Sequence, residues 1–261
     1  MKYVLSLSFG KDSMALLIEV IKRKLPLDYV IFCDIRFNSE ISGEHPIMAK
    51  WIPEAEKTLK DRFGVDVIHL TAETTFQDTF YRKKIKGNHI GQNYGFPYMT
   101  SPWCNGELKM NPIKKFIKKI IKEYGAITEY IGIASDEPKR LERYKELETD
   151  NHKYITLADL GIDEISAMDI CKQNNLLSPK YTNSFRGGCW FCNRQSLSDL
   201  YNLWKDYHEY FKMLEDMETG NFNKFRTDGL SLSERRKRFE CGFIPKKKQR
   251  NKQYSIFDFI E

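Results

Sequence analysis

Runs of apolar and β-branched residues alternate along the chain with segments whose apolar positions recur every three or four residues. The apolar runs predict strands at residues 3–7, 29–32, 65–70 and 129–134. The helical spacing predicts helices at 14–24, 47–63 and 111–124, and the last of these carries a row of lysines that we expect to be solvated. Because strands and helices alternate, we expect an α/β fold with a parallel sheet covered by helices on both faces.

The pattern changes after about residue 175. Residues 174–188 predict a loop, and 196–217 predict one long helix whose apolar and aromatic face belongs to a core. The predicted division is a nucleotide-binding α/β domain at 1–175, a small helical, cysteine-containing lobe at 176–245 and a basic tail at 246–261. Residues 71–104 form a long loop-like insertion, of the kind that serves as a lid or a recognition element.

The composition fits a folded chain with one main core, since 41% of its 261 residues are hydrophobic and 13% are aromatic. No apolar run approaches the roughly 20 residues of a membrane span. The chain begins directly with a predicted strand, so we expect a cytoplasmic protein with no membrane partner. The six cysteines are then thiols, metal ligands or catalytic groups. Cys33 and Cys171 lie in predicted strand and helix interiors and are expected to be buried.

The net charge of +6 is unevenly distributed. Between residues 224 and 252, eleven Lys and Arg residues face three acids, a local charge of +8, and the other residues sum to −2. Such a segment either contacts a polyanion such as a nucleic acid or is simply a solvated tail, and the sequence leaves both open.

The most informative segment is Ser-Phe-Gly-Lys-Asp-Ser at 8–13, between the first strand and the first helix. A strand, a short turn and a helix N-terminus present free N–H groups and the positive end of the helix dipole to an anion. Lys11 adds a cation, and Ser8 and Ser13 add hydroxyl donors, so we expect a phosphate-bearing ligand. The alternative is an ordinary N-cap at Asp12 or Ser13, which does not call for the adjacent glycine and lysine.

This segment resembles the Ser-Gly-Gly-x-Asp-Ser loop of the PP-loop ATP pyrophosphatases and of their relatives, the phosphoadenosine phosphosulfate (PAPS) reductase family. Phe9 replaces the first glycine, as it often does in the sulfonucleotide reductases, whereas Lys11, Asp12 and Ser13 are typical of the ATP-cleaving branch. The resemblance implies a Rossmann-like, adenine nucleotide alpha-hydrolase-like core that binds ATP or a related adenine nucleotide together with Mg²⁺. It also implies catalytic roles for Lys11 and Asp12, and nucleotide contacts from Ser8, Phe9, Gly10 and Ser13.

Cys189 and Cys192 form a Cys-x-x-Cys whose spacing suits one metal ion, one iron–sulfur cluster or a redox dithiol. Cys104 is the natural third ligand. Iron–sulfur members of the PAPS reductase family similarly carry a cysteine, then a Lys-containing pair and a proline, ahead of a later Cys-x-x-Cys. Lys109 and Pro112 stand in those places, although the cluster-bearing adenylylsulfate reductases have two adjacent cysteines where this chain has Cys104 alone.

Cys241 lies in a Glu-Cys-Gly motif that resembles the one carrying the nucleophilic cysteine of the sulfonucleotide reductases, with Ile244 where that family has a histidine. As a nucleophile it would attack the sulfur of a bound sulfonucleotide. As a ligand it would complete a four-cysteine set with Cys104, Cys189 and Cys192. A third possibility, implied by tRNA-thiolating relatives, is a [4Fe–4S] cluster with one iron left open to hold sulfide. Zinc remains the alternative to iron and sulfide.

Further residues are carried over by the same resemblance. Asp34 ends the second strand and would contact the nucleotide or its metal, with Glu40 or Glu44 following it toward the site. Glu44, His45 and Pro46 also suit a plain helix start. The stretch 132–140 resembles the family's Gly-x-Arg-x-x-Glu-x-x-Arg, with Ala134 in place of its first arginine. The remaining nucleotide-site candidates are Lys109, Gly132, Arg140, Arg143, Tyr181 and Arg186.

These features support three functional hypotheses. The first is an enzyme that uses ATP to adenylylate an acceptor, releases pyrophosphate and then transfers sulfur. Its acceptor could be a nucleic acid drawn by the basic C-terminal segment, with a sulfur donor or a reductant protein as a further partner. The second is a sulfonucleotide reductase with Cys241 as nucleophile. The third is a non-catalytic protein that senses nucleotides or binds nucleic acid.

Overall fold

The chain divides into two compact units in a computed structural model that describes residues 1–182, 184 and 187–246. The first unit comprises Met1–Asn193 together with Asn221–Asn223, and the second comprises Arg194–Gly220 and the chain from Lys224 onward. This division falls after Asn193, whereas the sequence predicted a boundary at residue 175. The Cys-x-x-Cys segment belongs to the first unit and not to a separate helical lobe.

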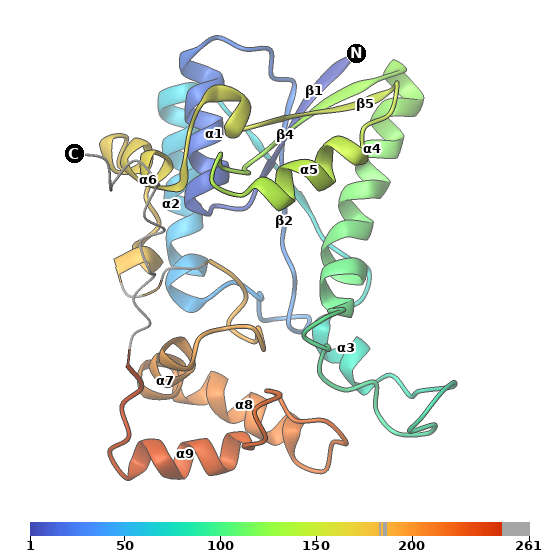
Figure 1. Cartoon of the computed structure of the whole chain (residues 1–261), viewed down its shortest axis with the longest axis vertical. Coiled ribbons are helices and arrows are strands. Elements are labelled where there is room, and N and C mark those ends of the chain that lie inside the picture. The colour runs from blue at the N-terminus through green and yellow to red at the C-terminus, as the bar shows by residue number, and fades with distance from the viewer. Residues whose placement is uncertain (183, 185–186, 247–261) are drawn as a thin grey trace, which may run out of the picture. The chain divides into compact units, whose positions relative to one another are not determined.

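The first unit is built on a five-stranded, all-parallel sheet with the order β3-β2-β1-β4-β5 (Figure 1). Its strands are β1 (Lys2–Leu7), β2 (Tyr29–Cys33), β3 (Val67–Leu70), β4 (Ile127–Ile131) and β5 (His152–Thr156). This confirms the predicted α/β class. β5 was not predicted from the sequence, because this strand is only partly buried and does not form an apolar run.

The strand order reverses at β1. In the sheet, Leu5 of β1 is paired with Val30 of β2 on one side and with Tyr130 of β4 on the other. The chain moves outward from β1 through β2 to β3 and then returns to β4 on the opposite side of β1. Ligands of open α/β sheets bind at the carboxyl ends of the strands where the order reverses. The segments 8–13 and 132–140 both begin at that point.

Helices cover both faces of this sheet (Figure 1). The helices of the first unit are α1 (Lys11–Lys22), α2 (Pro46–Phe63), α3 (Phe76–Tyr81), α4 (Asn111–Tyr124), α5 (Pro138–Glu146) and α6 (Glu164–Gln173). Three shorter turns are a π-helical turn η1 (Asn105–Met110) and the 3-10 turns η2 (Ala158–Leu160) and η3 (Pro179–Thr182). The bounds of α4 match the prediction, whereas α3 falls in a stretch predicted to be a loop. None of the described helices is long and apolar enough to cross a bilayer.

Side-chain alternation along β1 divides the core into two layers. Leu5 and Leu7 pack on the face covered by α1, α2 and α6. Val4 packs on the other face, against Ile113, Ile117 and Ile120 of α4. Cys33 and Cys171 are buried, as predicted.

The second unit contains the helices α7 (Leu197–Asp206), α8 (His208–Glu218) and α9 (Leu232–Glu240). The predicted continuous helix 196–217 is wrong, since Tyr207 breaks it with an extended φ of −141°. The break lets α7 and α8 pack against each other, which one straight helix could not do. Leu200, Leu203, Phe211 and Leu214 are buried, so the apolar stripe is a core face, as predicted.

Candidate functional site

The turn after β1 depends on an unusual backbone conformation at Phe9. This residue has a φ of 53°, in the left-handed region that favours glycine. Its ring is fully buried and packs edge-on against Phe32, with 5.0 Å between ring centroids, and against Trp51 at 6.3 Å. The ring holds the strained turn in place, so that α1 can begin at Lys11 with Gly10 as its N-cap. Strained backbone of this kind clusters at functional sites.

Two serine hydroxyls close this turn. The Ser13 Oγ accepts a hydrogen bond from the Ser8 N–H at 3.0 Å, lies 2.9 Å from the Ser8 Oγ and donates to the Gly10 carbonyl at 3.2 Å. The predicted residues Ser8, Gly10 and Ser13 are thus brought together. The first-turn N–H groups of a helix lack carbonyl partners within the helix, so this closed turn is a candidate anion-binding site.

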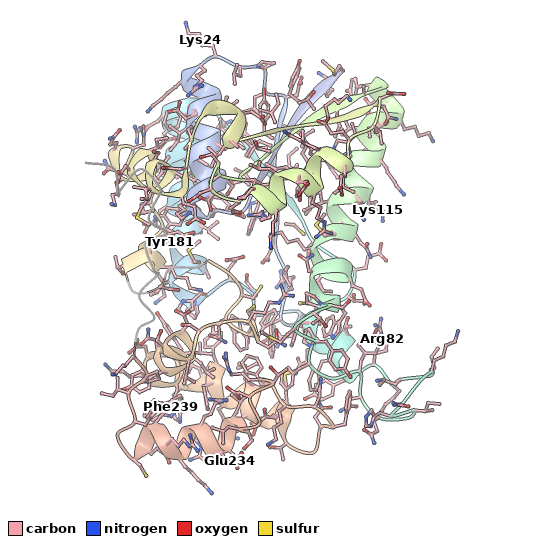
Figure 2. All side chains as sticks on the ribbon, in the orientation of Figure 1. Lys24, Arg82, Lys115, Tyr181, Glu234 and Phe239 are labelled. Carbon is pink, nitrogen blue, oxygen red and sulfur yellow. The ribbon has the colours of Figure 1, made fainter. Side chains whose placement is uncertain are left out.

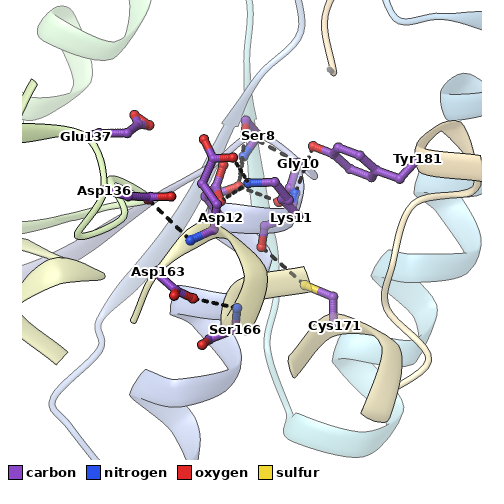
Figure 3. A network of polar contacts seen from close by, with 12 residues as sticks. Ser8, Gly10, Lys11, Asp12, Asp136, Glu137, Asp163, Ser166, Cys171 and Tyr181 are labelled. Atoms are coloured by element: carbon purple, nitrogen blue, oxygen red, sulfur yellow. Dashed lines mark hydrogen bonds and ion pairs between the residues drawn. The ribbon is translucent and has the colours of Figure 1, made fainter. Parts of the chain in front are cut away.

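Lys11 is only 5% exposed and is held by contacts from its neighbour Asp12 and from two other segments, α6 and η3 (Figure 3). Its ammonium lies 2.5 Å from the Asp12 Oδ1 and 3.5 Å from the Glu164 Oε2. Its N–H donates to the Tyr181 Oη at 3.1 Å, and its carbonyl accepts from the Cys171 Sγ at 3.2 Å. Tyr181 is among the residues predicted from the sequence, whereas Glu164 and this role of Cys171 were not predicted, because no local pattern marks either residue.

Gly132 brings the end of β4 against the first turn of α1. A Cβ on this residue would lie 2.5 Å from the Ser13 N and 2.8 Å from the Asp12 carbonyl carbon. Only glycine permits so close an approach of two backbones. The close packing of these two backbones therefore requires glycine at position 132, in addition to the nucleotide contact predicted for this residue.

Arg140 and Asp34, which were also predicted to contact the nucleotide, bond to residues outside the Ser8–Ser13 turn. The Arg140 guanidinium, in the exposed first turn of α5, pairs with the Glu137 carboxylate at 2.6 Å. Asp34 immediately follows β2 and accepts a hydrogen bond from the Ser42 Oγ at 2.7 Å. Arg186 lies outside the described residues.

The Cys-x-x-Cys segment is joined to the chain that follows β2. The Trp190 N–H donates to the Gly43 carbonyl and its indole N–H to the Ser42 carbonyl, both at 3.0 Å, and Glu44 and Cys189 form an isolated antiparallel bridge. A Cβ on Gly43 would lie 2.1 Å from the Ile35 carbonyl oxygen, so this close approach requires glycine. The sequence does not reveal this role of Gly43.

The turn that follows Cys104 reaches the same end of β2. The Cys33 thiol lies 3.5 Å from the Leu108 carbonyl oxygen and 3.6 Å from that of Lys109. Cys104 immediately precedes this π-helical turn. Parallel strands share one carboxyl edge, so the cysteine segments lie beyond the same edge of the sheet as the Ser8–Ser13 turn.

The charges near Cys189 indicate a cluster of acidic and thiol groups. Burial raises the pKa of Cys189 well above its usual value, and the charges of Glu44, Cys192 and Cys104 raise it further, while Lys109 opposes the shift. Burial likewise raises the pKa of Glu44 to about 7. Lys109 and Lys180 lie on the opposing side of this balance, since both lower the pKa of Glu44.

The three thiols predicted as ligands are not gathered around one point. Within the described part of the chain, no three Cys, His, Asp or Glu side chains form a ready metal-ion site. The donor set of thiols beside the half-buried Glu44 carboxyl nevertheless suits a thiophilic metal or an iron–sulfur cluster.

Cys241 and the basic C-terminal segment belong to the second unit. Cys241 is exposed at the C-terminal end of α9, where its N–H donates to the Lys237 carbonyl at 3.0 Å. The guanidinium of Arg235 pairs with Asp228, and that of Arg236 lies 3.0 Å from Glu215. These arginines of the basic segment therefore stabilise the unit itself. Residues 247–261 of the predicted tail lie outside the described residues.

Comparison with known proteins identifies no family. No protein-family model matches the chain. The uncharacterized nin region protein ORF290 of Escherichia phage lambda is 28% identical over 131 residues, which are 50% of this chain but only 42% of that protein. The U34-tRNA thiolase NcsA from Methanococcus maripaludis, solved with its [4Fe-4S] cluster, is 16% identical with a TM-score of 0.39 over 95% of this chain and 84% of that one. A likeness this low carries no argument for a shared fold or function.

Proposed function

We propose that this protein is a PP-loop-type enzyme that uses ATP to activate an acceptor for sulfur transfer. The observation that carries the proposal is the closed Ser8–Ser13 turn at the N-terminus of α1, placed where the strand order reverses. The cysteine segments beyond the same edge of the sheet support the sulfur-transfer half of the proposal.

The residues of the turn would act chiefly on the pyrophosphate leaving group. The Asp12 and Ser13 N–H groups in the first turn of α1 and the Lys11 ammonium would stabilise the negative charge that develops on pyrophosphate when the acceptor oxygen attacks the α-phosphorus. Asp12 and Asp34 would hold Mg²⁺, since hard carboxylate oxygens are its preferred protein ligands. The metal would neutralise the phosphates.

The cysteines would hold an iron–sulfur cluster through Cys104, Cys189 and Cys192. Such a cluster, when bound, supplies a soft site that can hold sulfide. In a sulfonucleotide reductase Cys241 would be the nucleophile, and its exposure is compatible with that role.

The nucleotide half of the proposal is tested by pyrophosphate release from ATP. We expect Lys11→Ala to abolish release, while the matched exposed lysine at the other end of α1, tested as Lys22→Ala, leaves it unchanged. Because Lys11→Ala leaves two carboxylates without their cation, Asp12→Asn serves as a second variant, checked for folding by circular dichroism. Release that persists in both folded variants would overturn the proposal.

The same preparations separate the competing functions. A reductase would release sulfite from a sulfonucleotide and lose this activity in Cys241→Ser, whereas the ATP-dependent enzyme would keep pyrophosphate release in that variant. A protein that only senses nucleotides would bind ATP and release neither product.

The cysteine half is tested by anaerobic purification followed by absorption spectroscopy and analysis of iron, sulfide and zinc. We expect a brown protein with near-stoichiometric iron and sulfide, lost in Cys189→Ala and retained in the control Cys33→Ala. A colourless protein with one zinc would make the site structural. A protein without metal would leave Cys189 and Cys192 as a redox pair.

A further inference from the structure

The most basic surface of the described chain lies in the first unit and not in the C-terminal segment. Residues 82–122 contain ten Lys and Arg residues and one acid, Glu107, a net charge of +9. This exceeds the net charge of the whole protein, which is +6. The segment covers an exposed hairpin at 82–94, the π-helical turn η1 and α4.

The hairpin is held in a defined position. Its strands are joined by hydrogen bonds from the Tyr94 N–H to the Arg82 carbonyl at 2.7 Å and from the Lys84 N–H to the Gln92 carbonyl at 2.9 Å. The Phe222 ring stacks on His89, with 4.4 Å between centroids, and lies 4.9 Å from the Lys84 ammonium. The hairpin therefore presents its cations from an anchored support.

The side chain of Asn223 anchors the base of the hairpin. Its Oδ1 accepts from the Phe96 N–H at 3.1 Å, and its Nδ2 donates to the Phe96 carbonyl at 2.8 Å. Arg82 then links the hairpin to η1, because its guanidinium makes two bonds, of 3.0 and 3.2 Å, to the Glu107 carboxylate. Arg82 and Lys115 are labelled in Figure 2, at the base of the hairpin and on α4. The single acid of the segment is thus already paired.

The outer face of α4 carries a lysine row. Its five exposed members are Lys114, Lys115, Lys118, Lys119 and Lys122. Among the described residues, only Lys115 of this row makes an ion pair, with the exposed Glu73 at 3.1 Å. Like charges four residues apart destabilise a helix by about 0.2–0.5 kcal/mol per pair, a cost that an anionic partner removes. A four-residue step along a helix is about 6 Å, so Lys114, Lys118 and Lys122 form one line of regularly spaced cations, and Lys115 and Lys119 form a second line beside it.

We propose that the hairpin 82–94 and the lysine face of α4 bind the phosphate backbone of a nucleic acid. This inference rests on the proposed function and extends it, because it makes a nucleic acid the acceptor that the enzyme activates. For the α4 face a membrane surface is the less suitable partner, because membrane-surface helices expose apolar side chains beside their cations. On α4 the apolar residues Ile113, Ile117 and Ile120 pack against the sheet instead. The hairpin does expose Ile85 and Ile90, so membrane binding is tested directly with vesicles below.

The proposal is tested by fluorescence anisotropy with a labelled 20-nucleotide single-stranded RNA and a DNA duplex of the same sequence, without ATP, at several salt concentrations. One variant combines Lys114→Gln, Lys118→Gln, Lys119→Gln and Lys122→Gln, and a second combines Lys83→Gln, Lys84→Gln and Lys86→Gln. The matched control combines Lys24→Gln, Lys50→Gln and Lys57→Gln, which are exposed lysines on and near α1 and α2.

We expect each test variant to weaken binding about tenfold or more near 100 mM salt. The slope of log affinity against log salt should also fall, by roughly 0.7–0.9 for each phosphate that the variant no longer neutralises. The control should bind as the wild type does. Equal weakening in the control, or unchanged binding in both test variants, would overturn the proposal. So would lysine-dependent binding to phosphatidylserine vesicles without binding to either oligonucleotide. Because ATP is absent, a negative result here is distinguishable from failure of pyrophosphate release.

Discussion

Phe9 has two opposing effects on the free energy of unfolding: its backbone conformation is unfavourable, and the burial of its ring is favourable. Its left-handed backbone costs about 1–2 kcal/mol relative to glycine, whereas truncating a buried phenylalanine costs about 3–5 kcal/mol. The burial term is the larger of the two. Its ring contacts with Phe32 and Trp51 therefore explain how the chain holds a glycine-type turn with an aromatic residue.

This balance predicts the effect of Phe9→Gly, which restores the glycine of the related loops. We expect the free energy of urea unfolding to fall by about 2 kcal/mol, because the ring is removed and only part of that cost is offset by relief of strain. A variant as stable as the wild type would show that the buried ring does not hold the turn.

Gly132 allows a sharper steric prediction. Gly132→Ala places a methyl group 2.5 Å from the Ser13 N, so the first turn of α1 must move away from β4. We expect a loss of about 1–3 kcal/mol in unfolding free energy and weaker binding of ATP in isothermal titration. The control is Gly106→Ala, whose Cβ would meet no atom within 4 Å and which should keep both stability and binding.

At the scale of elements, α6 supports the nucleotide turn. It packs against α1 and supplies Glu164 to the Lys11 ammonium and Cys171 to the Lys11 carbonyl. Its N-terminus is capped by Asp163, whose Oδ1 accepts from the Ser166 N–H at 2.7 Å. The position of these two contacts therefore depends on a helix that starts more than 150 residues after the turn.

The Asp163 cap predicts a pH dependence. Hydrogen bonds from the Ser166 side chain and backbone lower the pKa of Asp163, so its contribution to stability is fully present above the unfolded pKa of about 3.9 and is lost as the pH falls through the lower folded value. Asp163→Asn keeps an acceptor but cannot titrate. We expect the wild type to be more stable than this variant at pH 7, by about 0.3–1 kcal/mol. The difference should shrink toward zero in urea titrations at pH 2, and a constant difference would contradict this role.

At the scale of the whole molecule, the two compact units carry different features. The first holds the nucleotide turn, the Cys-x-x-Cys segment and the basic hairpin, and the second holds Cys241 on α9. A ligand that binds only the folded turn should therefore stabilise the first unit selectively.

Selective stabilisation can be measured by hydrogen exchange and thermal unfolding with Mg²⁺-ATP. At 100 times its dissociation constant, ATP should stabilise the folded first unit by about 2.7 kcal/mol and slow exchange in 8–14 and 132–135, with α9 unchanged. Ser13→Ala should lose the effect, because the turn loses its closing hydroxyl, and Ser39→Ala, at an exposed loop position, should retain it. Equal protection of α9 would contradict binding confined to the first unit.

The sequence by itself determined the features that reside in a few neighbouring residues. The apolar periods located four of the five strands and the whole of α4, and the small and polar residues at 8–13 indicated the turn at the start of α1. Periodicity and turn chemistry act over one or two helical turns, so they can be read without knowledge of the rest of the chain.

Only the tertiary structure decided which distant segments meet. It brought Tyr181 to the Lys11 N–H across 170 residues, Gly132 to the backbone of Ser13, and Trp190 to Gly43. Such contacts depend on the order in which the strands join the sheet and on how closely two backbones can approach, neither of which leaves a local pattern. The same reason explains why the unit boundary after Asn193 and the break at Tyr207 were not predicted, since both follow from packing and not from composition.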